Sequence, residues 1–189
     1  MKNKLNITDE DTLDEAERSI ASLRLLELAQ HPITGMFGFA HLRKIHRYIF
    51  KDIYEWAGEI REGEFLLKGD TLFCIGSRIP EYAENVFTKL KSEKYLRGQD
   101  KSGFAEKCAY YMAEINVLHP FREGNGRTSR EFFRELALKA GYTLRWQLAN
   151  PDELLQADIA AFDRNYAPLT AILHGIANIT KKQPRVAWR

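Results

Sequence analysis

Residues 119–130 read HPFREGNGRTSR, and this stretch concentrates more reactive chemistry than any other part of the 189-residue chain. It combines a histidine, a carboxylate, two glycines that flank an amide, and two arginines one helical turn apart. Apolar residues recur at helical spacing before it and again over residues 132–140. This pattern predicts that the stretch is a loop between two helices, because Pro120 disfavours the helical conformation at the residue that precedes it.

The predicted helix after the loop gives the stretch an electrostatic role. It is expected to begin near Asn125 or Gly126, and its first amides have no partner within the helix and lie at the positive end of the helix dipole. Gly124 and Gly126 lack side chains, so backbone N–H groups can approach an anion closely. Arg127 and Arg130 share one helix face and can reach the same phosphate chain. The loop is therefore predicted to bind a polyphosphate.

Two more groups in the loop indicate catalysis beside that phosphate. Glu123 is placed where a carboxylate would hold a magnesium ion that bridges phosphates. His119 suits a general base, because its ordinary pKa lies near the working pH. Phe121 is interpreted as a core anchor of the loop. For Arg134, one turn farther along the helix, a phosphate contact and a solvated basic face are equally open, and His46 is interpreted as a partly buried histidine with its hydrogen bonds satisfied.

The whole stretch resembles the signature of Fic-domain proteins, His-x-Phe-x-(Asp/Glu)-Gly-Asn-Gly-Arg-x-x-Arg, at every specified position. A second block, from Ile45 to Arg61, resembles the helix that precedes the active site in that family. The resemblance extends over about residues 37–145. It implies the Fic fold, a mainly α bundle of about seven helices with a small β-hairpin flap, in which residues 1–189 form a single Fic domain with a helical C-terminal part at 150–180.

Local signals place the elements of this bundle. Asp11 or Thr12 is expected to cap a first helix, and a second helix is expected to run on to Gly58. Ser77 is expected to cap the next helix, and Asn150 the one that opens with Pro151. The first helix is predicted to bury a set of apolar residues, namely Leu13, Ala16, Ile20, Leu23 and Leu26.

Residues 62–76 break the helical pattern and predict a short hairpin. The first strand is expected at 65–67, and the second at 72–75. A structural hairpin and a flap that captures an extended target segment by strand addition are both compatible with this pattern. The family resemblance favours the flap, whose target-docking residues would be Leu72, Phe73, Cys74 and Ile75.

The resemblance implies transfer of AMP from ATP to a protein hydroxyl. His119 would deprotonate an exposed Tyr, Thr or Ser of the target, and Glu123 would hold Mg²⁺. The phosphates would be bound by the loop and its arginines, namely Gly124, Asn125, Gly126, Arg127 and Arg130. Two alternatives stay open: a Fic-type protein phosphotransferase, which the two motif glycines disfavour, and a catalytically silent protein-binding regulator.

Many Fic enzymes are restrained by a glutamate from a Ser/Thr-x-x-x-Glu-Gly/Asn helix, and the chain contains no convincing match to that pattern. We therefore expect a separate small antitoxin that supplies a glutamate to Arg130, which would make this chain the toxin half of a pair or a related effector.

The composition limits the other partners. With 28 basic and 26 acidic residues the net charge is +2, which does not predict a nucleic-acid partner. No apolar run approaches the length of a membrane span, so no membrane partner is expected. Cys74 and Cys108 lack CxxC spacing, which favours a reducing cytoplasm, while delivery into another cell by a specialised secretion system stays open.

Overall fold

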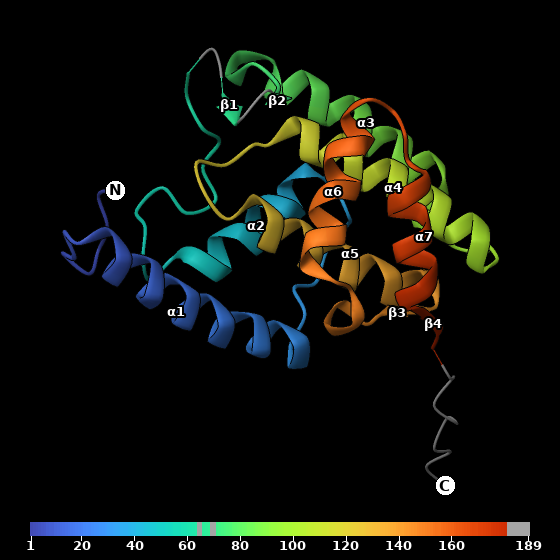
Figure 1. Ribbon diagram of the computed structural model, residues 1–189, viewed down its shortest axis with the longest axis horizontal. Helices are drawn as coiled ribbons and strands as arrows, with labels where there is room; N and C mark the ends of the chain where they lie inside the picture. Colours follow the sequence, from blue (N-terminus) through green and yellow to red (C-terminus); the bar gives the residue numbers. More distant parts are fainter. Residues whose placement is uncertain (64–65, 69–70, 181–189) are drawn as a thin grey trace, which may run out of the picture.

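The computed structural model describes residues 1–63, 66–68 and 71–180, and within them the chain is a helical bundle with two small antiparallel sheets (Figure 1). The strands pair as β1 (Leu67–Lys68) with β2 (Thr71–Leu72) and as β3 (Tyr142–Leu144) with β4 (Ala177–Ile179). This architecture confirms the predicted fold class. The seven α-helices of the described part are α1 (Glu10–Gln30), α2 (Phe39–Phe50), α3 (Ile79–Ser92), α4 (Lys101–Leu118), α5 (Asn125–Ala140), α6 (Pro151–Phe162) and α7 (Ala167–Ile176).

Helices α4 and α5 form the centre of the bundle, and the motif loop joins them. Helix α4 packs against α3, α5, α6 and α7, and α5 packs against α2 as well. The predicted limits of α5 are confirmed: it begins at Asn125, and Gly141 ends it in the left-handed conformation (φ 97°) that glycine adopts without strain. The loop is therefore anchored at both ends by buried helices.

Helix α1 differs from its prediction in its start and in its buried face. Asp9 caps it, rather than Asp11 or Thr12, and the Asp9 carboxylate accepts a 2.8 Å hydrogen bond from the Thr12 N–H. Leu23 and Leu26, which were expected inside, are 63% and 61% exposed. The helix packs against α2, and only a narrow stripe of it is covered. The buried residues of that stripe are Leu13, Glu17, Ala21 and Leu28.

Helix α2 ends at Phe50, so the prediction that it continues to Gly58 is wrong. The chain turns back over residues 51–57, and Gly58 takes a positive φ of 83°. A Cβ on Gly58 would lie 2.8 Å from the Cβ of Arg47. Glycine therefore allows the turn to fold closely against the helix that it leaves.

The sheets also depart from the sequence pattern. Each strand of the flap is only two residues long, and Phe65, Gly69 and Asp70 lie outside the described residues. The β3–β4 pair was not predicted. It pairs Tyr142 with Ile179, two residues far apart in the sequence, and ties the end of α7 to the end of α5. A turn signal in the sequence predicts pairing only between neighbouring strands, so it could not predict this pair.

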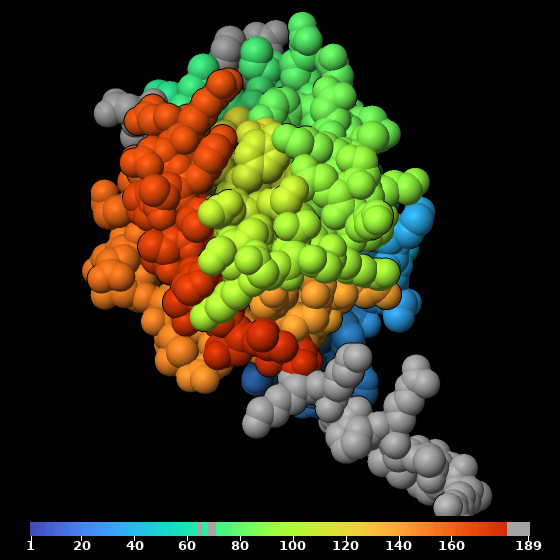
Figure 2. All heavy atoms as spheres, turned by 90° about the vertical axis from the view of Figure 1, so that its right-hand side faces the viewer, coloured from blue at the N-terminus to red at the C-terminus, as the bar shows by residue number. Residues whose placement is uncertain are grey.

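The remaining helices largely follow their predictions. The Asn150 side chain accepts hydrogen bonds from the N–H groups of Asp152 and Glu153 and caps α6 as expected. Ser77 does not cap α3, which follows a 3₁₀ turn at Gly76–Arg78. Figure 2 shows the face on which α4 lies between α7 and α3. Within the described residues, none of the helices is both long and apolar enough to cross a membrane, and the basic tail from Lys181 lies outside them.

Candidate active site

The motif loop is bracketed by two left-handed residues. Helix α4 ends at Leu118, and His119 takes φ 40° and ψ 60° while its N–H still donates to the carbonyl of Ile115 at 3.2 Å. Gly124, which precedes α5, has φ 78°. A Cβ on Gly124 would lie 2.2 Å from the ring of Phe50, so the loop passes directly over that ring. His119 and the N-terminus of α5 thus stand at the two ends of one short, tightly packed loop.

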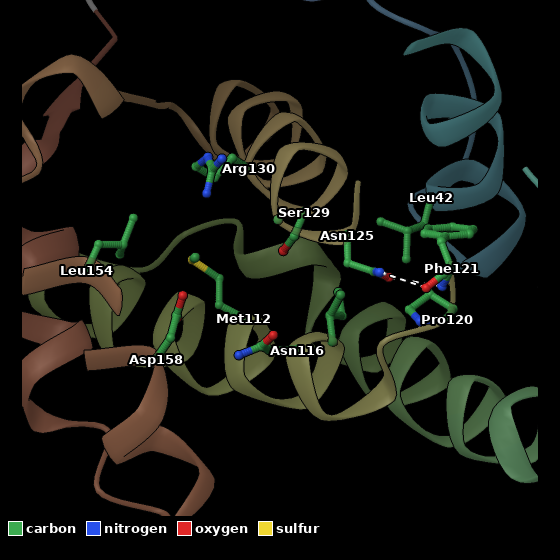
Figure 3. Close-up of a pocket in the computed structure, with 12 residues that line it drawn as sticks. Leu42, Met112, Asn116, Pro120, Phe121, Asn125, Ser129, Arg130, Leu154 and Asp158 are labelled. Atoms are coloured by element: carbon green, nitrogen blue, oxygen red, sulfur yellow. Dashed lines mark hydrogen bonds between the residues drawn. The ribbon is translucent and has the colours of Figure 1, made fainter. Parts of the chain in front are cut away.

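The side chain of Asn125 closes this loop. Its Oδ1 accepts a hydrogen bond from the Phe121 N–H at 3.0 Å, and its Nδ2 donates to the Phe121 carbonyl at 2.8 Å (Figure 3). Phe121 itself is buried, as a core anchor should be. Asn125 was expected to line the anion-binding loop. In the structure both polar atoms of its side-chain amide are hydrogen-bonded to the backbone of Phe121, within the loop itself.

His46 contacts the loop from the core of the bundle. Its ring stacks on the ring of Phe121 with 3.8 Å between centroids. Nδ1 of His46 accepts from the Gly58 N–H at 2.8 Å, which leaves Nε2 to donate to the Glu123 carbonyl at 3.0 Å. Burial lowers the pKa of His46 to about 4, so the ring is neutral at physiological pH. The interpretation of His46 as a satisfied histidine is confirmed, and its burial is complete.

Arg61 joins the loop to the flap. Its backbone N–H donates to the Pro120 carbonyl at 2.8 Å, and its Nε donates to the His119 carbonyl at 2.7 Å. Its Nη2 donates to the carbonyl of Cys74. The ring of Phe73 lies 4.0 Å from the His119 ring, centroid to centroid. The candidate base is therefore held between its own helix end and the foot of the flap.

The flap residues are placed differently from one another. Leu72 and Ile75 are 55% and 36% exposed, whereas Phe73 is buried against His119. Both backbone groups of Cys74 are engaged inside the molecule, because its N–H donates to Val117 and its carbonyl accepts from the Arg61 side chain. Strand addition by a target segment would therefore not use Cys74, and the docking role of the flap stays a prediction.

The three arginines of α5 have different surroundings. Arg127 pairs with Glu17 of α1 and lies 3.7 Å from the Glu123 carboxylate. Arg134 donates to Glu131 at 2.7 Å and to the Leu28 carbonyl at 3.0 Å. Arg134 therefore ties α5 to α1, and neither of its two contacts reaches the motif loop.

Arg130 points into a pocket between α4, α5 and α6 (Figure 3). Asp158 of α6 points into the same pocket, which Asn116 and Met112 of α4 also line. Burial raises the pKa of Asp158 to about 6, although the positive charge of Arg130 opposes that rise. Within the described residues Arg130 forms no ion pair, unlike Arg127 and Arg134, so its guanidinium is available to an external anion.

Sequence reasoning missed Glu17, Tyr54 and Asp158, which all line the cavities around the motif arginines. Glu17 carries a weak signal, because it continues the four-residue spacing of Leu13 and Ala21 on α1. A carboxylate within a buried stripe calls for a partner. Asp158 lies among alternating apolar and polar residues of α6, where no comparable signal exists.

The fold and this loop define the class of protein. A family model described as the Fic/DOC family matches residues 37–137, which is more than half of the chain. The chain belongs to the Fic/DOC family, as the motif resemblance predicts.

Relatives of known name point to one activity. Protein adenylyltransferase VbhT of Bartonella schoenbuchensis is 39% identical over 92% of this chain and 36% of its own length. The chain thus spans only a minor part of that protein. The probable protein adenylyltransferase Fic of Escherichia coli is 42% identical over 78% of this chain and 72% of its own length. The probable protein adenylyltransferase y4lH of Sinorhizobium fredii is 39% identical over 90% of this chain and 88% of its own length.

Solved structures agree with this placement. The BepC protein of Bartonella tribocorum, with bound AMPPNP, matches with a TM-score of 0.90 at 27% identity, over 96% of this chain and 93% of that one. The N-terminal Fic domain of a cell filamentation protein of Bartonella quintana, with bound ADP, matches with a TM-score of 0.89 at 27% identity, over 96% and 92%. Both of these similar structures hold an adenine nucleotide.

We expect Gly124→Ala to lower the free energy of unfolding more than Gly98→Ala does. The two glycines have nearly equal φ, 78° and 77°, so alanine brings a similar strain of about 1–2 kcal/mol at each. The Cβ at 124 would also meet Phe50, whereas no described atom lies within 4 Å of the one at 98. Overpacking at position 124 should increase the loss of unfolding free energy by about 1–3 kcal/mol. Urea denaturation of the two variants measures this difference. Equal losses would contradict the close approach of the loop to Phe50.

Proposed function

We propose that this chain is a protein adenylyltransferase, which transfers AMP from ATP to a Tyr, Thr or Ser hydroxyl of a target protein. The observation that carries the proposal is the complete Fic motif on a rigidly held loop at the N-terminus of α5. The names of the Bartonella, Escherichia and Sinorhizobium relatives support it. In this proposal residues 1–189 act as a single Fic domain, with the flap as the edge on which the target docks.

ATP binding follows from the charge around the loop. The first amides of α5 point out of the helix without intrahelical partners, and Gly126 adds no side chain to block them. Arg127 and Arg130 flank the same opening. These groups bind the phosphate chain, with the β- and γ-phosphates on the two arginines.

The chemical step begins at His119, which takes the proton from the target hydroxyl. The hydroxyl oxygen forms a bond to the α-phosphorus of ATP, and the bond from that phosphorus to the bridging oxygen breaks, so pyrophosphate leaves. Arg127, Arg130 and the α5 amides offset the negative charge that develops on the leaving group. Because these groups are held before the reaction, catalysis rests on positioning and electrostatic stabilisation.

A magnesium ion fits beside Glu123. The Oε1 of Glu123 accepts from the Gly124 N–H at 2.8 Å, and the side chain is partly exposed toward the cavity of the arginines. Among the described residues, no cluster of three or more acidic, histidine or cysteine side chains could hold a metal. A single carboxylate agrees with Mg²⁺, which binds mainly through phosphates and water. When bound, the ion would neutralise charge on the phosphates.

Labelled ATP tests the reaction directly. When the chain is added to a cell lysate, we expect a new protein band labelled from α-labelled ATP and no new band labelled from γ-labelled ATP. His119→Ala should reduce the labelling by about 10²–10⁴-fold while ATP affinity, measured by calorimetry, is retained. His31→Ala, at an exposed histidine, is the matched control. Transfer of γ-label would instead support the phosphotransferase, and the absence of both labels would support the silent regulator.

Glu123→Ala should weaken the magnesium dependence of ATP binding. Calorimetric titrations of ATP with and without Mg²⁺ should differ in the wild-type chain and become nearly equal in the variant, because the protein ligand for the ion is gone. Glu55→Ala, at an exposed glutamate outside the loop, should behave like the wild type. An unchanged magnesium effect in Glu123→Ala would remove Glu123 from the site.

Restraint by a separate antitoxin-like partner is part of the proposal. Arg130 makes no ion pair with any carboxylate of the described residues, and Glu17 pairs with Arg127 instead. A glutamate from a partner would form a charge-assisted pair with Arg130 and displace the γ-phosphate. The proposal places the pair in the cytoplasm, which fractionation of the producing cell would check.

Expression of this chain alone in a bacterium should slow growth, whereas co-expression with its partner should restore it. His119→Ala expressed alone should be harmless. If the wild-type chain is harmless and labels nothing, and a variant of one of its own glutamates becomes active, then restraint is internal and the separate partner is wrong.

A further inference from the structure

Helix α1 contributes a carboxylate to the phosphate site. Arg127 donates through Nη2 to Oε1 of Glu17. Glu17 and other residues of α1 form one wall of the cavity that also contains Glu123, Arg127 and Arg130. Glu17 lies outside residues 37–137, which the family model matches, so the motif does not include it.

The Glu17 carboxylate is fixed at both oxygens. Its Oε2 accepts a hydrogen bond from the hydroxyl of Tyr54, and its side chain is only 8% exposed. Burial and the hydrogen bond to Glu17 both raise the pKa of Tyr54, so the hydroxyl stays protonated and keeps donating. Glu17 therefore cannot swing with the arginine, and it sets the place where one end of the guanidinium lies.

The rest of the Arg127 guanidinium remains usable. Its Cζ lies 4.9 Å from the centroid of the Phe50 ring, which supports one face. Within the described residues, its Nε and Nη1 groups make no hydrogen bond. A guanidinium carries five N–H donors, so contact with Glu17 through Nη2 leaves donors for a phosphate. Glu17 and a phosphate can therefore bind Arg127 at the same time.

We propose that Glu17 is a positioning residue, which holds the Arg127 guanidinium in the orientation that binds the phosphate chain of ATP. The proposal rests on the proposed function, since it assigns Arg127 to that chain. The competing idea is a brake, in which Glu17 occupies Arg127 in place of a phosphate. The geometry favours positioning, because Glu17 contacts one nitrogen of Arg127 and does not pair with Arg130.

Contacts other than those of Glu17 also hold α1 to the bundle. Arg24 pairs with Asp52 at 2.7 Å, and Tyr48 donates to Glu27 at 2.9 Å. The Leu28 carbonyl accepts from Arg134. These contacts lie along the rest of the helix, so a substitution at Glu17 tests its effect on Arg127 in a folded protein, and thermal denaturation would check this.

The test compares Glu17→Ala and Glu17→Gln with Glu10→Ala, each alone and in the Arg127→Ala background. Glu10 lines the same cavity from the same helix, so its variant removes a similar negative charge without touching Arg127. The readouts are the affinity for a non-hydrolysable ATP analogue by calorimetry, and kcat and KM for ATP separately in the labelling reaction.

Glu17→Ala should weaken analogue binding about tenfold and lower kcat/KM by about 10–100-fold, because a misplaced guanidinium loses its aligned contacts. Glu17→Gln should recover most of this, because its amide oxygen can still accept from Arg127. Glu10→Ala should act like the wild type, and Glu17→Ala should add nothing once Arg127 is absent.

Several outcomes would overturn the proposal. Higher activity or tighter binding in Glu17→Ala would establish a brake. Unchanged binding and kinetics, or an equal loss in the Arg127→Ala background, would show that Glu17 does not act through Arg127. If the wild-type chain binds the analogue but labels no protein, the adenylyltransferase proposal fails. The affinities of the variants for the analogue would then still decide the role of Glu17. If the wild-type chain binds no analogue, both proposals fail.

Discussion

The double hydrogen bond between the Asn125 side chain and the Phe121 backbone holds the motif loop in one shape. Because Phe121 is buried under the ring of His46, this shape is tied to the core of the bundle. His46 in turn holds the Glu123 carbonyl, so the loop is fixed on both sides of Gly124. The direction of the first α5 amides, and with it the proposed phosphate site, depends on these contacts.

The two motif arginines, Arg127 and Arg130, differ in their electrostatic surroundings. Arg127 lies between two carboxylates, Glu17 and Glu123, which partly neutralise its charge and fix its position. Arg130 faces Asp158 without pairing with it, and so keeps more of its attraction for an incoming anion. One arginine that is held in place and one that is free to exchange its partner suit the proposed site, which would bind and release a nucleotide.

The helix boundaries around the candidate site could be predicted from the sequence, because the signals that place them are local. Pro120, Gly141 and Asn150 end or begin helices through their own backbone or side-chain chemistry, and the structure confirms each boundary. The same is not true of Glu17 or of the pairing of Tyr142 with Ile179. Those contacts join segments that are distant in sequence, and no pattern within either segment specifies the partner.

The wrong predictions for the buried face of α1 and for the flap both arise from tertiary contacts that a local pattern does not contain. Leu23 and Leu26 fit a helical stripe, but α1 is covered by α2 on one side only, so tertiary packing buries the predicted Leu13 together with Ala21 and Leu28, and leaves Leu23 and Leu26 exposed. The second flap strand is shorter than its apolar run suggests, because the backbone of Cys74 bonds to Val117 and to the Arg61 side chain instead of to the first strand.

A crystal structure of the chain with Mg²⁺ and a non-hydrolysable ATP analogue tests the central claim most directly. We predict that the loop keeps its present shape, with Asn125 still bonded to Phe121. The β- and γ-phosphates should lie on Arg127 and Arg130 at the N-terminus of α5, and the α-phosphate should lie within reach of a hydroxyl bound to His119. A nucleotide bound elsewhere, or a loop that must rebuild to receive it, would contradict a preformed phosphate site.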